Sequence, residues 1–231
     1  MRRAGPWAEG PLLPPGWRPD REEPRDTSGD HHWVIVDPAG RIRLADGTTI
    51  ALRPLRPGDG DLLAAGFDRL SERSRYRRFL SPVPHLTPSM LNFLTSVDGV
   101  DHRAWGALIT EPAGPVGAGV VRWVRDSKNP AVADMAVTVI DDYQGRGLGA
   151  LLQDVAVLDA FSFGVERFEG VVLGENIASR RMLARGGARL RPDGGGVLAF
   201  TLELRPRVER LRTSPLSIII GTQNGRTALT A

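Results

Sequence analysis

Hydrophobic and polar positions alternate with a period of two in several stretches of the chain, a pattern typical of half-buried strands. Residues 33–59 alternate around two turns, and the second turn, Asp46-Gly47, is a strong β-hairpin signal. Three more strand-like runs follow, at 104–110, 116–125 and 131–140. Because a short Pro/Gly turn at 111–115 joins the first two of these runs, we expect antiparallel pairing.

Apolar residues at helical spacing predict helices between and after these strands. The first helix is indicated by Leu62, Leu63, Phe67 and Leu70, and the next begins at Thr87, whose side chain can cap it. Beyond residue 147 the pattern predicts a helix, a buried strand, a helix and a last strand, at 148–163, 168–174, 176–187 and 197–204. The order predicts an α/β chain in which antiparallel strands precede a βαβαβ half.

The 231 residues are enough for one good-sized core with ragged ends. Residues 1–32 are rich in proline and mixed charge and show no periodicity, so they predict a disordered tail. We therefore divide the chain into this tail, a domain at 33–206 and a C-terminal tail at 207–231, in which Ile218–Ile220 could dock on the domain.

The charge comes almost entirely from arginine, since Lys128 is the sole lysine; the net charge is +3 and the isoelectric point is 10.1. The arginines are interleaved with acids, so we expect no nucleic-acid partner. The chain has no cysteine and four histidines, and we expect no metal site. No signal peptide and no membrane span are evident, which predicts a soluble, cytoplasmic protein with no membrane partner.

The segment "DDYQGRGLGA" at 141–150 has the features of an anion site. A strand, a glycine-rich turn and a helix start bring free backbone N–H groups and a helix dipole to one point, and Arg146 adds a charge. One interpretation is a tight turn without a ligand. A second is the dinucleotide pattern GxGxxA at Gly145, Gly147 and Ala150, with Glu166 or Glu169 for the ribose. A third is the pyrophosphate of coenzyme A.

The third interpretation rests on a family resemblance. Gln144, Gly147 and Gly149 in this spacing, followed 27 residues later by Asn176 at a strand end, resemble the acyl-CoA signature of the GNAT acetyltransferase superfamily. The likeness spans roughly residues 41–205. Within it, "LRPLRPGDGDLL" and "LSERSRYRRF" are similar to the acetyltransferase domain of bacterial Pat-type protein lysine acetyltransferases. The resemblance implies a GNAT fold, in which helices flank a mixed, mostly antiparallel central sheet with one splayed strand pair.

The same resemblance implies the binding residues for acetyl-CoA, the co-substrate of this superfamily. The strand before the loop would contact the pantetheine arm through its backbone, at Val137, Thr138 and Val139. The loop would hold the pyrophosphate, through Gln144, Gly145, Arg146, Gly147, Leu148 and Gly149. Asn176 and Ser179 would contact the arm from the other side, and Arg180 or Arg181 could reach the adenosine phosphates unless they only form a solvated helix face.

An amine of pKa about 10.4 must lose a proton before it attacks a thioester, which costs roughly 4 to 5 kcal/mol at pH 7. The resemblance places a carboxylate on the strand before the loop, and here that residue is Asp134, the predicted general base, acting through a water. The alternative for Asp134 is an ion pair with Arg122 or Arg125. His102 is a second candidate or a solvated histidine.

Many members of the superfamily have a tyrosine that protonates the leaving thiolate, but the residue at that position is Leu183 here. Val137 N–H is the expected donor to the thioester oxygen. The sequence thus predicts an acyl-CoA-dependent N-acetyltransferase that acts on a primary amine, a protein lysine first of all. Two alternatives are an acetyltransferase for a small amine and a non-catalytic module that senses acyl-CoA. The sequence does not indicate the oligomeric state.

Overall fold

The computed structural model describes residues 33–37, 40–112, 114–212 and 214–224. The strands are β1 (Trp33–Asp37), β2 (Arg41–Leu44), β3 (Thr49–Pro54), β4 (His102–Glu111), β5 (Gly114–Arg125), β6 (Val132–Val139), β7 (Arg167–Leu173), β8 (Arg189–Pro192) and β9 (Val197–Glu203). The helices are α1 (Gly60–Asp68), α2 (Glu72–Phe79), α3 (Pro88–Thr95), α4 (Leu148–Ser162), α5 (Ile177–Gly186), α6 (Leu204–Leu211) and α7 (Pro215–Gln223). Two short 3-10 turns, η1 (Pro57–Asp59) and η2 (Asp141–Tyr143), precede α1 and the glycine loop.

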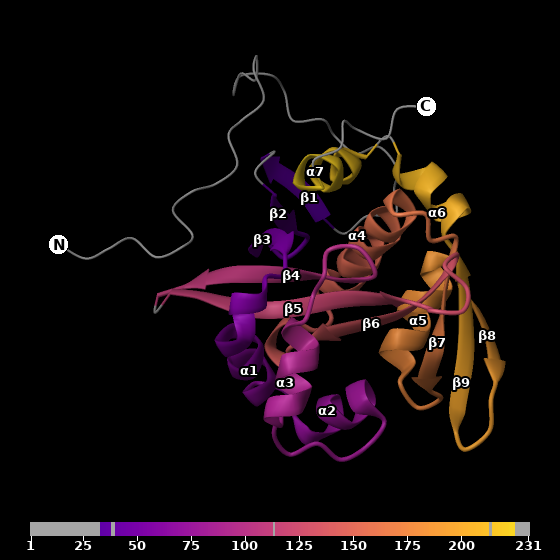
Figure 1. Cartoon of the computed structure of the whole chain (residues 1–231). Coiled ribbons are helices and arrows are strands. Elements are labelled where there is room, and N and C mark those ends of the chain that lie inside the picture. Colours follow the sequence, from indigo (N-terminus) through magenta and orange to yellow (C-terminus); the bar gives the residue numbers. More distant parts are fainter. Residues whose placement is uncertain (1–32, 38–39, 113, 213, 225–231) are drawn as a thin grey trace.

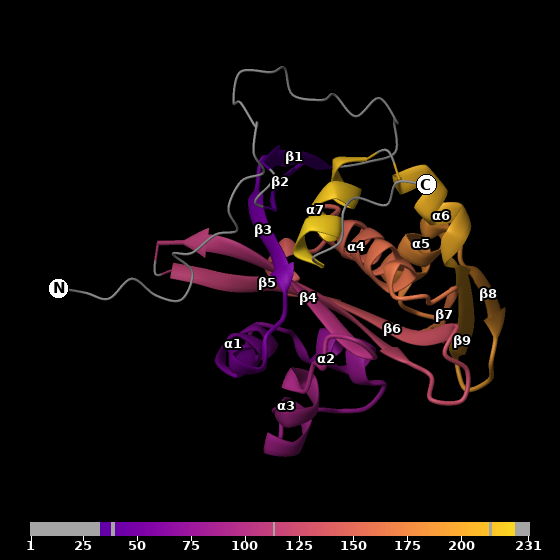
Figure 2. The ribbon, with the colours of Figure 1, turned by 45° about the horizontal axis from the view of Figure 1, so that its top comes forward.

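All nine strands of the described residues form one sheet, in the order β1-β2-β3-β4-β5-β6-β7-β9-β8. Neighbours pair antiparallel except β6 and β7, which are parallel. The predicted antiparallel pairing of the three central runs is therefore confirmed, and so is the mixed, mostly antiparallel sheet. Helices α1, α2 and α3 cover one face of the sheet, and α4 lies on the other with α5, α6 and α7 (Figures 1 and 2).

The main core lies between the sheet and α4. Alternating side chains of the strands point into it, with Trp105 and Trp123 among the largest that are fully buried. Helix α4 is buried along most of its length because the sheet covers one side and α6 and α7 cover the other. A helix enclosed in this way is apolar on most of its surface, and its polar exceptions Gln153, Asp154 and Asp159 are buried as well.

The C-terminal segment corrects the prediction of a tail from residue 207. Leu204, Val208 and Leu211 recur at helical spacing on α6, and all three are buried against α4 in the main core. Residues Leu216, Ile219 and Ile220 of α7 are buried as well. The core thus extends to α7, while the tail predicted at 1–32 and residues 225–231 lie outside the described residues.

Two local differences from the sequence prediction have simple causes. The first predicted helix is divided into α1 and α2, because Ser71 adopts an extended conformation and its side chain caps α2 by accepting from Ser74 N–H at 3.2 Å. Strand β8 was not predicted, since two residues of this four-residue edge strand are arginines and three are exposed. None of the helices formed by the described residues is long and apolar enough to cross a membrane.

Candidate active site

Strands β6 and β7 separate from one another at Asp134. Their parallel pairing is limited to three residue pairs, of which Asp134 and Glu169 are the last, although β6 continues to Val139 and β7 to Leu173. Beyond Asp134 a gap therefore opens in the sheet. This separation is the splayed strand pair that the sequence led us to expect.

The unpaired backbone of β6 is turned toward this gap at alternate residues. Ile140 N–H donates to Ala118 O on the β5 side at 3.0 Å, and Ala131 O accepts from Glu166 N–H on the β7 side at 2.8 Å. Because backbone groups alternate along a strand, the N–H and C=O of Val137 and Val139 point into the gap. Both residues fit the predicted contact with the arm, whereas the backbone of Thr138 faces β5.

The glycine loop lies at the far end of the gap and leaves its amides free. Gly145 and Gly147 have φ values of +76° and +88°, which side chains with a Cβ adopt only with strain, and Gly147 directly precedes α4. Within the described residues, the backbone N–H groups from Gly145 to Ala150 donate no hydrogen bond. Six free amides at a helix N-terminus form a strong anion site.

Side chains from α2 and from the β2–β3 hairpin fix the position of this loop. Gln144 donates from Nε2 to Val139 O at 3.0 Å and to Ser74 Oγ at 3.3 Å. Arg146 pairs with Asp46 at 3.0 Å and lies over the Tyr143 ring. The Arg146 guanidinium is therefore held by the hairpin, and the groups that the loop leaves free for an anion are its backbone amides.

Helix α5 packs against the start of α4 at Gly149, and Asn176 caps α5. The Asn176 side chain is buried and caps α5 by accepting from Ser179 N–H at 3.2 Å. A methyl group on Gly149 would lie 3.3 Å from the Met182 sulfur of α5, so glycine permits the close approach of the two helices. Leu148, the first residue of α4, is buried in the core and contributes through its backbone N–H. On the outer face of α5, Arg180 donates to Gly174 O.

Asp134 lies at the point where the gap begins. Its side chain is accessible to solvent, yet the surrounding protein removes part of the hydration of the carboxylate and raises its pKa, an effect that the Arg78 charge opposes. Gly170 leaves space beside it, because a methyl group there would lie 3.4 Å from Asp134 Oδ2. Neither predicted partner pairs with Asp134: Arg125 pairs with Asp101 at 2.7 Å, and Arg122 bonds to His102.

His102 is not a solvated histidine. Only 8% of its surface is exposed, and Arg122 Nη1 lies 2.7 Å from its Nε2. Because a guanidinium only donates, Nε2 must accept. Burial, followed by the Arg122 charge, lowers the pKa of His102. With its acceptor nitrogen occupied, His102 positions Arg122, and Asp134 is the carboxylate free to accept a proton.

Two residues near Asp134 were not singled out from the sequence. Arg78 was visible only as part of a basic run, and Gly170 only as part of a buried strand. Leu183, where many superfamily members have tyrosine, is buried in the core. Within the described ranges no three carboxylate or histidine side chains gather in a way that could hold a metal ion.

The gap, the free loop amides and the capping asparagine lie where the resemblance led us to expect a GNAT acyl-CoA site, and comparison with known proteins identifies the family. The family described as acetyltransferase (GNAT) domain matches residues 49–189. The chain belongs to this family.

The curated relatives of the chain include one that is named Pat. The chain is 38% identical over 166 residues to "Acetyltransferase Pat" of Mycolicibacterium smegmatis, covering 71% of this chain and 49% of that protein. It is 34% identical over 137 residues to "Acetyltransferase PA5475" of Pseudomonas aeruginosa, covering 58% of this chain and 69% of that protein. The chain thus spans about half the length of the first relative.

Solved structures show the same fold. The GNAT domain of S. lividans PAT superposes with a TM-score of 0.65 at 26% identity, covering 71% of this chain and 95% of that one. A mutant of the cAMP-binding acyltransferase from Mycobacterium smegmatis gives a TM-score of 0.55 at 32% identity, covering 80% of this chain and 53% of that one.

Proposed function

We propose that this chain transfers an acetyl group from acetyl-CoA to a primary amine, that of a protein lysine, with Asp134 as general base. The observation that carries the proposal is the gap that begins at Asp134 and leads to the free amides of the glycine loop. The pyrophosphate lies on these amides, and the arm follows the gap along Val137 and Val139. The dinucleotide alternative is disfavoured because antiparallel strands precede the loop.

The reaction follows from these positions. The amine nitrogen attacks the thioester carbon, its proton passes through a water to Asp134, and the C–S bond breaks to give an amide and the CoA thiolate. Val137 N–H, which points into the gap, donates to the thioester oxygen as negative charge develops on it. With a thiol pKa near 8.5, the thiolate takes its proton from water, which agrees with an apolar Leu183 at the acid position.

Binding of the donor is tested at Gly147. In Gly147→Glu the side chain brings a carboxylate to the anion site, and we expect calorimetry to show loss of CoA binding. Gly147→Gln is the matched control, because it has the same size and the same unfavourable φ without the charge. Tight NAD binding by the unchanged protein, or equal CoA affinity in the two variants, would contradict the proposal.

Catalysis is tested at Asp134. Asp134→Asn should leave the affinity for CoA nearly intact and lower turnover about 10²- to 10⁴-fold at neutral pH, and less at high pH, where the amine is already neutral. Unchanged turnover across the pH range would exclude Asp134 as the base.

The acceptor is identified by mass spectrometry after incubation with acetyl-CoA, cell lysate and a panel of amines. Acetylated lysines in proteins support the proposal, and acetylated small amines alone favour the small-amine alternative. Absence of any product, with CoA binding intact, favours a module that senses acyl-CoA. Lys128 is an internal control for self-acetylation at a lysine.

A further inference from the structure

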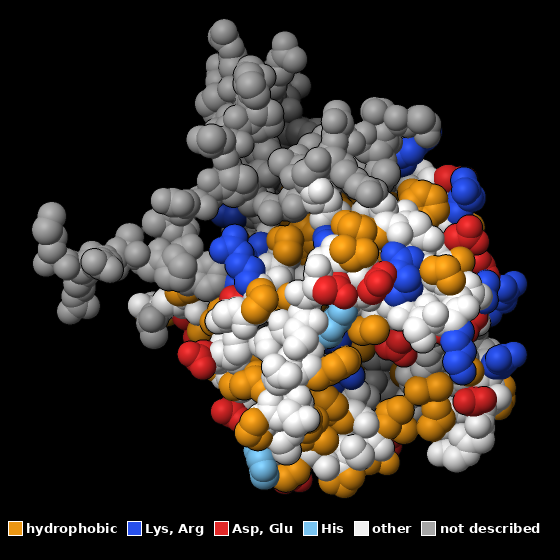
Figure 3. Space-filling model, viewed as in Figure 1, with side chains coloured by type: hydrophobic (Ala, Val, Ile, Leu, Met, Phe, Trp, Pro, Cys, Tyr) orange, Lys and Arg blue, Asp and Glu red, His pale blue; other side chains and the backbone are white. Residues whose placement is uncertain are grey.

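A cavity opens on the face of the sheet that carries Asp134. It lies between β5, β6 and helices α1, α2 and α3, and its walls are apolar, with Leu62, Phe67, Phe79, Leu94 and Ile140 among them. Figure 3 shows hydrophobic side chains gathered over these helices. The cavity volume is about 80 Å³. At roughly 10 to 15 Å³ for each water-sized group, it accommodates a chain of about five to eight non-hydrogen atoms.

Two arginines, Arg78 of α2 and Arg122 of β5, line this cavity, and among the described residues that line it no other side chain is charged. Arg122 lies opposite Ala136 on β6, two residues from Asp134, so the arginines are at the end of the cavity nearest the transfer site. The cavity is therefore adjacent to the point where the thioester and the amine meet.

Arg122 is buried without an anionic partner. Only 4% of its surface is exposed, and its hydrogen bonds go to His102 Nε2 at 2.7 Å and Leu94 O at 3.0 Å. Both acceptors are neutral. Burial, followed by the nearby charge of Arg78, lowers the pKa of Arg122 to about 10, so the guanidinium remains charged at neutral pH.

Arg78 has no hydrogen bond or ion pair to another described residue; its guanidinium lies over the Phe79 ring, 5.0 Å from the centroid. Burial lowers its pKa, and the charge of Asp134 opposes that effect. Asp134 can balance one of the two positive charges, and the other stays unbalanced. A buried charge of this kind is costly unless a ligand pairs with it.

We propose that this cavity binds a short chain ending in a carboxylate, with Arg78 and Arg122 as its partners. The apolar walls contact the chain, and the planar guanidinium groups donate to its two oxygens. The inference rests on the proposed acyl transfer at Asp134, and it adds a substrate that carries a carboxylate to the acetyl group and the lysine proposed above. The carboxylate belongs either to the acyl group of the donor or to the acceptor amine.

The donor arm of the test measures binding of succinyl-CoA and butyryl-CoA, which have the same number of acyl carbons, by calorimetry. The acceptor arm measures binding of L-leucine and L-leucinamide to the protein saturated with CoA. In one of the two arms we expect the compound with the carboxylate, succinyl-CoA or L-leucine, to bind at least about tenfold more tightly than its partner without one, as charge-assisted hydrogen bonds imply. The arm in which the preference occurs identifies the source of the carboxylate.

Arg78→Met keeps the apolar stem and removes the charge, so the preference should fall to about twofold or less. Arg78→Lys keeps the charge but lacks the planar guanidinium with its paired N–H donors, so it should retain part of the preference. Arg189→Met is the control, because it removes one exposed arginine from β8, far from the cavity. A preference below about twofold in both arms of the unchanged protein, or one that persists in Arg78→Met, would overturn the proposal. Acetyl-CoA binding in the same experiments tests the transfer site separately.

Discussion

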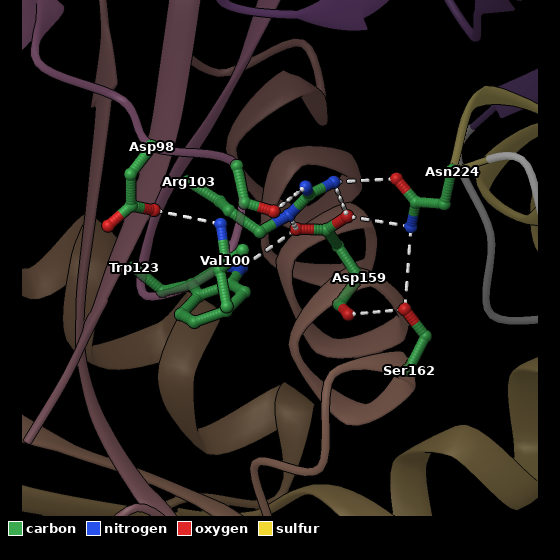
Figure 4. Close-up of polar contacts among 8 residues, drawn as sticks. Asp98, Val100, Arg103, Trp123, Asp159, Ser162 and Asn224 are labelled. Atoms are coloured by element: carbon green, nitrogen blue, oxygen red, sulfur yellow. Dashed lines mark hydrogen bonds and ion pairs between the residues drawn. The ribbon is translucent and has the colours of Figure 1, made fainter.

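Asp159 on α4 is the acceptor of a buried hydrogen-bond network, and its substitution tests whether α7 belongs to the core. The side chain is fully buried, and each carboxylate oxygen accepts two donors (Figure 4). Arg103 Nη2 and Asn224 Nδ2 donate to Oδ1 at 2.8 and 2.9 Å. Arg103 Nε and Trp123 Nε1 donate to Oδ2 at 2.9 and 2.8 Å.

In Asp159→Asn the amide nitrogen must face two donors, whichever way the side chain is turned. Two of the four hydrogen bonds are lost, and Arg103 keeps no anionic partner in this network. At roughly 1.5 to 3 kcal/mol for each bond to a charged group, the free energy of unfolding falls by about 3 to 6 kcal/mol. For a domain of this size the melting temperature falls by roughly 10 °C or more.

Urea unfolding followed by circular dichroism measures this loss directly. Glu203→Gln is the control, because Glu203 and Arg189 form an exposed pair at 3.6 Å that contributes at most about 1 kcal/mol. If Asp159→Asn costs less than about 1 kcal/mol, the network does not form, and the packing of α7 against α4 is wrong.

Three further predictions concern the gap. Gly170→Ala adds a methyl group 2.8 Å from the Phe200 ring and should cost about 1 to 3 kcal/mol in urea unfolding, whereas Gly106→Ala, with nothing within 4 Å, should cost far less. Asn176→Ala should lower the free energy of unfolding by about 0.5 to 2 kcal/mol and should also weaken CoA binding. Asn176→Asp keeps the cap, so it should weaken CoA binding alone. Equal stability of the two variants would contradict this prediction. The pKa of Asp134 in the folded state is raised above 3.8, so the ionised carboxylate lowers the free energy of unfolding above that pKa and has no such effect below 3.8. Asp134→Asn should therefore raise the melting temperature at pH 7 but not near pH 3. A lower melting temperature of the variant at pH 7 would refute the direction of this pKa shift.

The sequence predicted those parts of the fold that depend on local patterns. Strands β4, β5 and β6 follow from alternation, and α4 follows from its apolar run after the loop. It could not show the network around Asp159, since Asn224 lies 65 residues away and joins it only after α7 has packed on α4. Nor could it show that the pairing of β6 with β7 ends at Asp134, because strand register is set by tertiary packing.

The site was predictable to a different extent on the two faces of the sheet. The glycine loop is local, so three glycines and a helix start were enough to predict an anion site there. The cavity on the opposite face is lined by Arg78 from α2 and Arg122 from β5, and Asp134 from β6 is close enough for its charge to act on Arg78. No spacing in the chain connects these three residues. The residues proposed for the donor's pyrophosphate are therefore readable from sequence, whereas Arg78 and Arg122, proposed for the carboxylate, require the fold.

Strand β6 contributes to both faces of the sheet because the side chains of neighbouring residues point to opposite faces. Val137 and Val139 turn their backbone to the gap and their side chains toward α4, while Thr138 and Ile140 turn their side chains to the cavity. Asp134 lies on the cavity side by the same alternation. A shift of register by one residue would exchange these directions and move the Asp134 carboxylate into the apolar layer beneath α4. The pairing of β6 with β5 along its length thus fixes both which residues of β6 turn their backbone to the gap and which turn their side chains to the cavity.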